Sequence, residues 1–471
     1  MENHDFDLII IGGGPAGYVA AIRAAQLYAK VCLIEKERMG GTCLNTGCIP
    51  TKALYRSAEV CHMIRNSEEF GIVNRETIIN WEQVQERKAK VVNQLVGGID
   101  QLMKANSITV VKGEAKLTGT HEVSVILSDA STKIISAKNI VIATGSKTAG
   151  LPIEGADLTG VIDSTALLDI DHIPDKLTII GGGVIGIEFA AIFNAFGSEV
   201  TVVEFLPNLL AQMDSDISKR LVPMMKKKGI KILTSSKVMK IEEQDDKLLL
   251  AVSTGKEDIT IETDQVLVAV GRQPEVEHLM LENVGVIFDK KGIKTNHFGQ
   301  TNVPNIYAIG DVTGGIMLAH TASHQGIIAI EHAMGLETKT NMDTVPSCVF
   351  AFPEIAFVGI TEDEAKAKGM VYKTGKFMFG ANGKALTLGE GEGFIKVIAD
   401  EDDRLIGVHI LGPHASDLIH EGVLAIGMKI SVEDIIGTIH AHPTLSESFA
   451  EAVMDLKGIS LHSMPTKKRK G

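Results

Sequence analysis

The sequence predicts an α/β protein in which two similar units, one inserted into the other, precede a C-terminal α+β domain. Two segments, "FDLIIIGGGPAGYVAA" from Phe6 and "KLTIIGGGVIGIEFAA" from Lys176, share an apolar run, a G-x-G-x-x-G motif and an Ala-rich helical pattern. A later apolar run, Asn305 to Val312, ends in a glycine turn, as expected of a strand that completes the first unit. From Pro346 the pattern changes to alternating strands and then helices, which indicates a further domain.

These patterns predict where the domains begin and end. We assign residues 1–149 and 276–345 to the first unit, 150–275 to the inserted unit and 346–471 to a C-terminal α+β domain. The chain of 471 residues is long enough for three or four domains. The basic end of the chain, "PTKKRKG", is expected to be a solvated terminus.

Composition and charge argue against several classes of partner. The net charge is -13, which disfavours nucleic acid or an anionic membrane as the main partner. The longest stretch without charge, Leu8 to Ile22, has 15 residues, contains glycines and a proline, and is too short for a membrane span. The polar start "MENHDF" does not resemble a targeting peptide, and five cysteines make no disulfide framework. We therefore expect a cytoplasmic protein.

The two glycine motifs are typical of Rossmann-like dinucleotide-binding domains. Gly12 lets the strand turn, Gly14 lets the backbone approach a pyrophosphate, and Gly17 lets the helix pack on the strand. The helix then offers unpaired N–H groups to the phosphates. The inserted unit has the same three positions, Gly181, Gly183 and Gly186.

An acidic residue ends the second strand of each unit. In both copies the acid, Glu35 or Glu204, follows the first glycine by 23 residues. A carboxylate at this place accepts hydrogen bonds from ribose hydroxyls. Glu204 would repel a 2′-phosphate, and the following "FLPNLL" has no arginine to receive one, so the second site is expected to prefer NAD. Two dinucleotide sites suggest that electrons pass between a bound FAD and an exchanging NAD.

The stretch "GGTCLNTGCIPTK" contains two closely spaced cysteines, Cys43 and Cys48. In a regular helix, residues five apart point about 140° away from each other and lie roughly 7.5 Å apart along the axis. A disulfide needs Cα atoms within about 7 Å, so the intervening "LNTG" must bend. Pro50 suits the first turn of a following helix, which puts Cys48 near a helix N-terminus and Lys52 one turn later. Both features favour a reactive thiolate.

A zinc site and a pair of inert thiols are the alternatives to a redox pair. Cys61 and His62 could complete a set of zinc ligands. However, Cys61 falls 13 residues into an apparently continuous helix, about 19 Å from its start. We therefore expect no metal.

Several motifs occur together in one order: the two glycine motifs, the cysteine stretch, "ATGS", "VGRQP", "AIGDV" and "HAHPTLSE". On these motifs the chain resembles the pyridine nucleotide–disulfide oxidoreductases from Asp5 to Lys457. Within that family it is most similar to the NAD-dependent members that reoxidise protein-bound dihydrolipoamide. The resemblance implies FAD and NAD as cofactors, a homodimer, and a lipoyl-bearing partner protein, either a 2-oxo acid dehydrogenase acyltransferase or a glycine-cleavage carrier.

The resemblance also implies roles for single residues. Cys43 would exchange with the dithiol, and Cys48 would lie against the flavin. Lys52 and Glu188 would form a buried ion pair near the flavin, and Asp311 would bind its ribityl chain. The remaining expected contacts are Gly113, Thr144 and Gly145 for FAD and Gly271 for NAD.

The motif "HAHPTLSE" offers a base, which the reaction needs because a dithiol must lose a proton before it attacks a disulfide. The family pattern implies His442 as this base and Glu447 as its partner, acting on the disulfide of the other subunit, with His440 the less favoured histidine. A carboxylate partner would orient the imidazole. Thr444 and Glu447 also fit a helix capping box, which is a structural alternative for the glutamate.

Three other functions are alternatives for a chain of this family. A glutathione-reductase-like enzyme would need arginines after the second Rossmann strand, and a mercuric-reductase-like enzyme usually adds paired C-terminal cysteines. A structural flavoprotein would need neither the cysteine pair nor the histidine. Ala351, Phe352 and Gln325 depart from the residues common in the family, near the expected contact of the flavin and interface domains.

Overall fold

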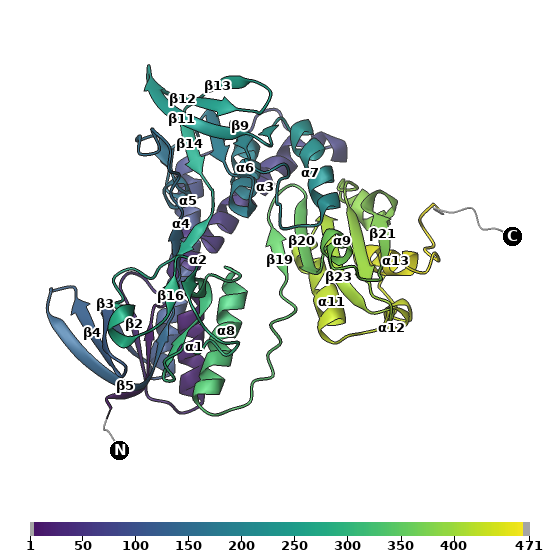
Figure 1. Ribbon diagram of the computed structural model, residues 1–471. Coiled ribbons are helices and arrows are strands. Elements are labelled where there is room, and N and C mark those ends of the chain that lie inside the picture. The colour runs from purple at the N-terminus through teal and green to yellow at the C-terminus, as the bar shows by residue number, and fades with distance from the viewer. Residues whose placement is uncertain (1–3, 465–471) are drawn as a thin grey trace.

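The computed structural model describes residues 4–464, so the expected solvated tail lies outside the described part of the chain. In Figure 1 the first unit lies at the lower left, the inserted unit at the top and the C-terminal unit at the right. No helix within residues 4–464 is long and apolar enough to cross a membrane.

The first unit is built on a six-stranded sheet in the order β1-β2-β3-β4-β5-β18. The strands are β1 (Phe6–Ile11), β2 (Val31–Glu35), β3 (Thr109–Gly119), β4 (Glu122–Leu127), β5 (Thr132–Ile142) and β18 (Ile306–Ala308). Its helices are α1 (Pro15–Gln26), α2 (Gly41–Thr46), α3 (Cys48–Arg65), α4 (Trp81–Ala105) and α8 (Ala319–Ala333). Strand β18 pairs in parallel with β5, so a late segment joins the sheet of the first unit.

Strand β1 shows why this sheet lies in the middle of the unit. Leu8 and Ile10 pack in one apolar cluster with the helices, while Ile9 and Ile11 pack in another on the opposite face. All four side chains are buried. An apolar run without polar alternation is what a parallel strand covered on both faces requires.

The inserted unit has a parallel sheet in the order β10-β9-β8-β14-β7. The strands are β7 (Val161–Ile162), β8 (Lys176–Ile180), β9 (Glu199–Val203), β10 (Lys231–Leu233) and β14 (Gln265–Val268). Helices α5 (Ser164–Leu168), α6 (Val184–Phe196) and α7 (Ser215–Lys227) belong to this unit. An antiparallel meander packs on the sheet through Ile180 and Val203, and its strands are β11 (Lys237–Gln244), β12 (Lys247–Ser253) and β13 (Asp258–Thr263).

The chain passes between the two units at a short antiparallel ladder of β6 (Ser146–Thr148) and β15 (Arg272–Pro274). The remaining elements before the C-terminal unit are η1 (Ser67–Phe70), η2 (Leu281–Val284), β16 (Phe288–Asp289), β17 (Gly292–Ile293) and η3 (Gly310–Thr313). The ladder lies beside the predicted boundaries at 149 and 275, which remain predictions, as does the boundary at 345.

The C-terminal unit has an antiparallel sheet in the order β19-β20-β23-β22-β21. The strands are β19 (Ser347–Val349), β20 (Glu354–Gly359), β21 (Lys373–Met378), β22 (Phe394–Ala399) and β23 (Leu405–Gly412). Its helices are α9 (Glu362–Ala367), η4 (Phe379–Ala381), α10 (Gly383–Thr387), α11 (Ala415–Gly427), α12 (Val432–Ile436) and α13 (Glu447–Asp455). Two α/β units, one with a mostly parallel sheet and one with a parallel sheet, followed by an α+β unit confirm the predicted fold class.

A buried ion cluster joins the inserted unit to the C-terminal unit. The Lys396 ammonium lies 2.9 Å from Oδ1 of Asp214, 3.2 Å from Oδ2 of Asp216 and 2.5 Å from Oε2 of Glu362. The side chains of Lys396 and Asp214 are 4% and 0% exposed. Burial raises the pKa of the Asp214 carboxyl, but the hydrogen bond from Lys396, the nearby His409 and two backbone N–H groups together outweigh burial, and the pKa is lowered.

Replacing Lys396 by methionine should destabilise the protein, because it leaves the Asp214 carboxylate buried without a cation. Breaking such a pair costs about 3–5 kcal/mol of unfolding free energy. The control is Lys376→Met, since Lys376 is 40% exposed and lies 3.3 Å from Asp216, and an exposed pair contributes about 1 kcal/mol or less. Urea denaturation of the flavin-loaded protein measures the difference, and equal losses in the two variants would contradict a buried cluster.

Candidate active site

The two cysteines lie on either side of a break between two helices. Cys43 is in α2, and Cys48 is the first residue of α3. A Cβ atom at Gly47 would lie 2.9 Å from the Thr42 carbonyl oxygen and 3.3 Å from the Cys43 Cα. Glycine is therefore required at 47 for the helices to approach, and the predicted bend is concentrated at this residue. Asn45 closes α2 by donating to the Gly41 carbonyl at 3.0 Å.

The two sulfur atoms are chemically unequal. Both cysteines are free thiols, and the Cys43 thiol donates a hydrogen bond to the Cys48 sulfur. This hydrogen bond, together with the Lys52 ammonium, lowers the pKa of Cys48 to about 7 although burial opposes it. The same hydrogen bond raises the pKa of Cys43, because a donor must keep its proton. Cys48 is thus the thiolate of the pair near neutral pH.

The Lys52 side chain is held by an ion pair that connects three parts of the chain. Its Nζ atom lies 2.8 Å from both carboxylate oxygens of Glu188, which is in α6 and is 6% exposed. The Phe350 N–H donates to Glu188 Oε1 at 3.1 Å, and the Lys52 ammonium lies 4.4 Å from the centre of the Phe350 ring. A buried carboxylate needs such partners. Phe350 was not predicted from the sequence, and no local pattern indicates this long-range contact.

The two glycine turns have nearly the same geometry. A Cβ at Gly12 would lie 2.3 Å from the Ala143 carbonyl oxygen, and a Cβ at Gly181 would lie 2.3 Å from that of Ala269. A Cβ at Gly17 would lie 1.8 Å from the Gly12 oxygen. The equivalent distance from Gly186 to the Gly181 oxygen is 2.0 Å. Larger residues would separate each helix from its strand.

The two acids hold these turns in matching ways. Glu35 Oε2 accepts from the Gly13 N–H at 2.6 Å, and Glu204 Oε2 accepts from the Gly182 N–H at 2.5 Å. No atom lies within 4 Å of a Cβ built on Gly183, and only the Gly41 Cα comes within 4 Å of one built on Gly14. Each turn therefore leaves open the approach that a pyrophosphate needs, beside a carboxylate placed for ribose. The residues fit two dinucleotides.

The other predicted cofactor contacts lie around the β6–β15 ladder, with one exception. Thr144 Oγ1 donates to the Glu275 carbonyl at 2.7 Å, and the Glu275 N–H donates to the Gly145 carbonyl at 2.9 Å. Gly271 precedes β15 with φ of 127° and open space at its Cβ position. The exception is Gly113 in β3, where a Cβ would lie 2.4 Å from the Ile126 oxygen. Strand pairing alone therefore explains the glycine at 113.

Asp311 lies in η3 and contacts the same ladder. Its Oδ2 accepts from Ser146 Oγ at 2.5 Å, and Arg272 Nε donates to the same hydroxyl at 2.8 Å. The N–H of the preceding residue, Gly310, donates to the Gln325 side-chain oxygen at 2.7 Å. The departure at Gln325 therefore lies directly beside the predicted ribityl contact.

The structure pairs both histidines of "HAHPTLSE" with glutamates. His442 Nδ1 lies 2.9 Å from Glu447 Oε1, and the His442 side chain is 77% exposed. His440 Nε2 lies 2.6 Å from Glu421 Oε1, and its side chain is 9% exposed. Only His442 combines a carboxylate partner with free access to solvent. Glu421 was not predicted, because it lies in a separate helix, α11, and no spacing motif connects it to His440.

The capping box is only half formed. The Thr444 N–H donates to Glu447 Oε2 at 2.9 Å, but the Thr444 hydroxyl donates to the Ala441 carbonyl instead of capping the helix. Helix α13 begins at Glu447 itself, after Ser446. One carboxylate thus fixes both the turn and His442, so the structural and the catalytic interpretations of the glutamate are compatible.

A single chain does not bring the histidine to the cysteines. In Figure 1, α13 lies at the right with the C-terminal unit, well apart from α2 and α3. The alternative zinc ligands are also not assembled, since the His62 ring stacks on Phe352 with centroids 5.0 Å apart. Within residues 4–464, no group of three or more His, Cys, Asp or Glu side chains could hold a metal ion.

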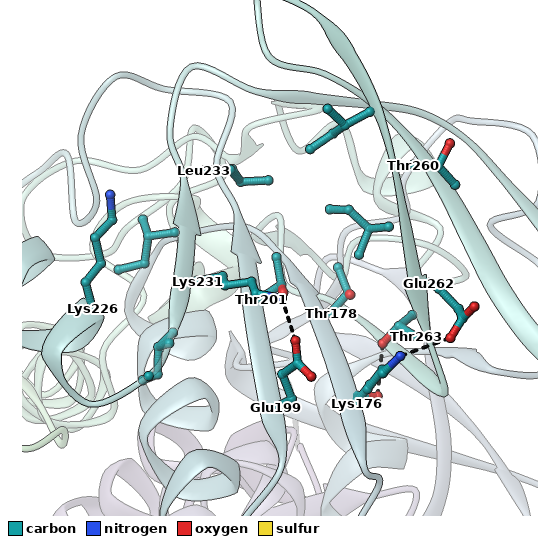
Figure 2. A pocket seen from close by; sticks show the side chains of 15 residues that line it. Lys176, Thr178, Glu199, Thr201, Lys226, Lys231, Leu233, Thr260, Glu262 and Thr263 are labelled. Carbon is teal, nitrogen blue, oxygen red and sulfur yellow. Dashed lines mark hydrogen bonds and ion pairs between the residues drawn. The ribbon is translucent and has the colours of Figure 1, made fainter.

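A wide cavity in the inserted unit lies at the other end of the sheet from its glycine turn. Figure 2 shows the lining residues Lys176, Glu199 and Lys231, which are the first residues of β8, β9 and β10. Gly181 and Glu204 follow the last residues of β8 and β9. Dinucleotides bind at the carboxyl ends of parallel strands, so this cavity is not the second dinucleotide site.

Removing the positive charge of Lys52 and removing the negative charge of Glu188 should shift the pKa of Cys48 in opposite directions. Lys52→Met removes an attraction for the thiolate and should raise the pKa of Cys48, by about one unit for a single close charge. Glu188→Gln removes a repulsion and should lower it. The pH dependence of alkylation at Cys48 in the reduced protein, located by peptide mass, measures both. Shifts in the same direction would show that these charges do not control the thiol.

Comparison with known proteins gives family matches over most of the chain. The model of the pyridine nucleotide-disulphide oxidoreductases matches residues 6–326, and the model of their dimerisation domain matches residues 345–453. Two solved structures of the HOCl-induced flavoprotein disulfide reductase RclA from Escherichia coli, one a Cu(II) complex, are similar in fold. Their TM-scores are 0.86 for the complex and 0.85, at 29% identity, over 96% and 95% of this chain and 99% of each RclA chain.

Curated relatives are similar along their whole length. Dihydrolipoyl dehydrogenase of Bacillus subtilis is 43% identical over 470 residues, covering 97% of this chain and 99% of that protein. The Staphylococcus aureus enzyme of the same name is 42% identical over 463 residues, covering 97% and 98%. The mitochondrial one of Caenorhabditis elegans is 42% identical over 457 residues, covering 96% and 92%. The chain therefore belongs to the pyridine nucleotide–disulfide oxidoreductase family and is an oxidoreductase that uses FAD and NAD.

Proposed function

We propose that the protein reoxidises protein-bound dihydrolipoamide to lipoamide and reduces NAD+ to NADH. The observation that carries this proposal is the pair of unequal thiols, with Cys48 at the start of α3 beside Lys52 and Cys43 keeping its proton. The relatives of B. subtilis, S. aureus and C. elegans named dihydrolipoyl dehydrogenase, similar over nearly the whole chain, support this choice of substrate.

The proposed thiol chemistry follows from the unequal sulfurs. His442, with Nδ1 held by Glu447, takes a proton from the dithiol at its free Nε2 atom. The resulting substrate thiolate attacks Cys43 of the oxidised pair, and the Cys43–Cys48 bond breaks with Cys48 leaving as thiolate. The second substrate thiol attacks the mixed disulfide and frees Cys43, which takes the proton from His442. Lipoamide is formed, one proton is released, and the cysteine pair holds two electrons.

The assignment of leaving group and attacked sulfur has a physical reason. The sulfur with the lower pKa leaves faster, and Lys52 stabilises Cys48 as a thiolate. Cys43, which keeps its proton in the reduced pair, is the sulfur that the next substrate attacks once the disulfide has formed again. Glu188 has two opposing effects on Cys48: it holds the Lys52 ammonium in place, and its own charge disfavours the thiolate.

The cofactors are assigned to the two turns. Gly12, Gly14, Gly17 and Glu35 would hold FAD, with Asp311 at its ribityl chain, and the equivalent residues Gly181, Gly183, Gly186 and Glu204 would hold NAD. Bound FAD would supply the electron acceptor for Cys48 and a hydride donor for NAD+. Glu204 accepts backbone hydrogen bonds at both Gly182 and Leu206, which leaves a negative charge where a 2′-phosphate would lie.

A homodimer with shared active sites is part of the proposal. The match to the family's dimerisation domain supports it. In the single chain Ile439, next to His440, is 96% exposed, and Leu424 on α11 and Met428 directly after it are 64% and 72% exposed. An apolar surface beside the His442–Glu447 pair is consistent with a second subunit that presents its own Cys43 there. The lipoyl group would come on an acyltransferase or a glycine-cleavage carrier in the cytoplasm.

Steady-state kinetics of the flavin-loaded protein tests the proposed substrate. The kcat/KM for NADH formation from dihydrolipoamide and NAD+ should exceed the kcat/KM for NADPH oxidation by glutathione disulfide by at least about a thousandfold. The physical reason is the negative charge of Glu204, which would repel the 2′-phosphate of NADPH. A preference for glutathione disulfide and NADPH would overturn the assignment.

Two cysteine variants provide controls for that assay. Cys48→Ser should abolish the dithiol-dependent reaction, because no disulfide can form. Cys61→Ser, in the same helix but partly buried against the apolar core, should retain nearly full activity. Full activity in Cys48→Ser would contradict the thiol chemistry even if the substrate preference were as proposed.

A further inference from the structure

A second, smaller cavity lies where three parts of the chain meet. It has a volume of about 290 Å³. Its walls include His62 and Arg65 at the end of α3, Asn194 in α6, Lys228 just after α7, and Phe352 before β20. We call it the α3–α7 cavity. Neither the cysteine pair nor the glycine turns line it.

The α3–α7 cavity contains cations that no carboxylate neutralises at close range. Within residues 4–464, neither Arg65 nor Lys228 forms an ion pair. Arg65 Nη1 reaches only the Asn194 carbonyl, at 3.5 Å, and Lys228 Nζ lies 3.3 Å from His62 Nε2. A third lysine in the lining, Lys227, is instead paired with Glu392 at 2.9 Å.

The titration behaviour of these groups agrees with a positive potential in the cavity. Burial lowers the pKa of the Lys228 ammonium, and the distant carboxylates of Glu390 and Glu392 offset this only in part. Burial, followed by the charges of Lys228 and Arg65, lowers the pKa of His62 to about 4. His62 is therefore neutral at physiological pH, because burial and then the charges of Lys228 and Arg65 disfavour its protonated form.

The wide cavity of Figure 2 provides a contrast. There two of the three lining lysines are paired with carboxylates, with Lys176 Nζ 2.9 Å from Glu262 Oε1 and Lys231 Nζ 2.5 Å from Glu199 Oε1, while the third, Lys226, is exposed on α7. An anion binding to Lys176 or Lys231 would have to break an existing ion pair. In the α3–α7 cavity it would meet Lys228 and Arg65 without displacing a carboxylate.

The aromatic residues of the smaller cavity restrict what can bind. The Phe352 ring is stacked between Tyr55 and His62, with centroid distances of 4.9 and 5.0 Å and interplanar angles of 15° for both. Both faces of the ring are occupied, so no aromatic face is free to stack a base. The Lys228 ammonium lies 5.8 Å from the same ring centre. The cavity thus combines cationic donors with an apolar wall of Ala191, Ala195, Met225, Ile230 and Ala351 that offers an anion no competing charge.

We propose that the α3–α7 cavity, with Arg65 and Lys228 as its donors and His62 and Asn194 beside them, binds a phosphate-type oxyanion. Arginine matches two oxygens of such an ion at once, and lysine adds a point charge. The ion is either inorganic phosphate or the phosphate of a nucleotide. Its binding ties the end of the helix that begins with Cys48 to α6 and α7 of the inserted unit. This site is independent of the proposed reaction.

Calorimetric titration of the flavin-loaded protein with inorganic phosphate, at constant ionic strength in chloride, tests the site. Saturable binding is expected. Lys228→Met and Arg65→Met should each weaken it by about tenfold or more, since a hydrogen bond to a charged group contributes on the order of 1.5–3 kcal/mol. Lys226→Met is the matched control, because this exposed lysine of α7 lines the other cavity and should leave phosphate affinity unchanged.

Titration with AMP distinguishes the sources of the ion. AMP can also bind the dinucleotide sites, so only the part of its binding that is lost in Lys228→Met is assigned to the α3–α7 cavity. If phosphate binds but Lys228→Met loses no AMP binding, the ligand of the cavity is the free ion. If AMP and inorganic phosphate compete for the cavity, the ligand is a nucleotide phosphate. Absence of saturable binding by both ligands, or unchanged affinity in Lys228→Met and Arg65→Met variants that retain bound flavin, would overturn the proposal.

Discussion

The hydrogen bond between the Cys43 thiol and the Cys48 sulfur, at the first residue of α3, is the interaction on which the site depends. It assigns the proton to one sulfur and the negative charge to the other. Lys52, one turn further along, supports that assignment only because Glu188 and the Phe350 backbone hold it. Three segments far apart in the sequence must therefore fold together before the two cysteines become chemically different.

The rest of the protein places electron carriers around that point. Both dinucleotide turns use the same solution, in which a glycine faces a carbonyl and a carboxylate binds the next glycine's N–H. The β6–β15 ladder connects the units that carry the two turns, and Arg272 donates a hydrogen bond to Ser146 across it. The buried Lys396 cluster then fixes the C-terminal unit against the inserted one. Local turn chemistry is thus combined with a few long-range polar contacts.

The sequence predicted what depends on local pattern. The paired glycine motifs, the 23-residue spacing to Glu35 and Glu204, and the start of α3 at the cysteines all follow from neighbouring residues. Contacts between distant segments had no such signal, as with Phe350 on Lys52, Glu421 on His440 and Ser146 on Asp311. The capping box was ambiguous because Thr444 and Glu447 fit it by spacing, while the helix begins two residues later than a cap at Thr444 requires.

Subunit complementation tests most directly the proposal that the thiols and the base of each active site lie on different subunits. Dimers of Cys43→Ser chains alone or of His442→Gln chains alone should be inactive, but a mixed dimer would have one site with intact cysteines and an intact histidine. Random reassortment makes half of the dimers mixed, each with one working site of two, so the mixture should regain about a quarter of the unmodified dithiol-dependent activity. No recovery in verified mixed dimers would contradict the shared site.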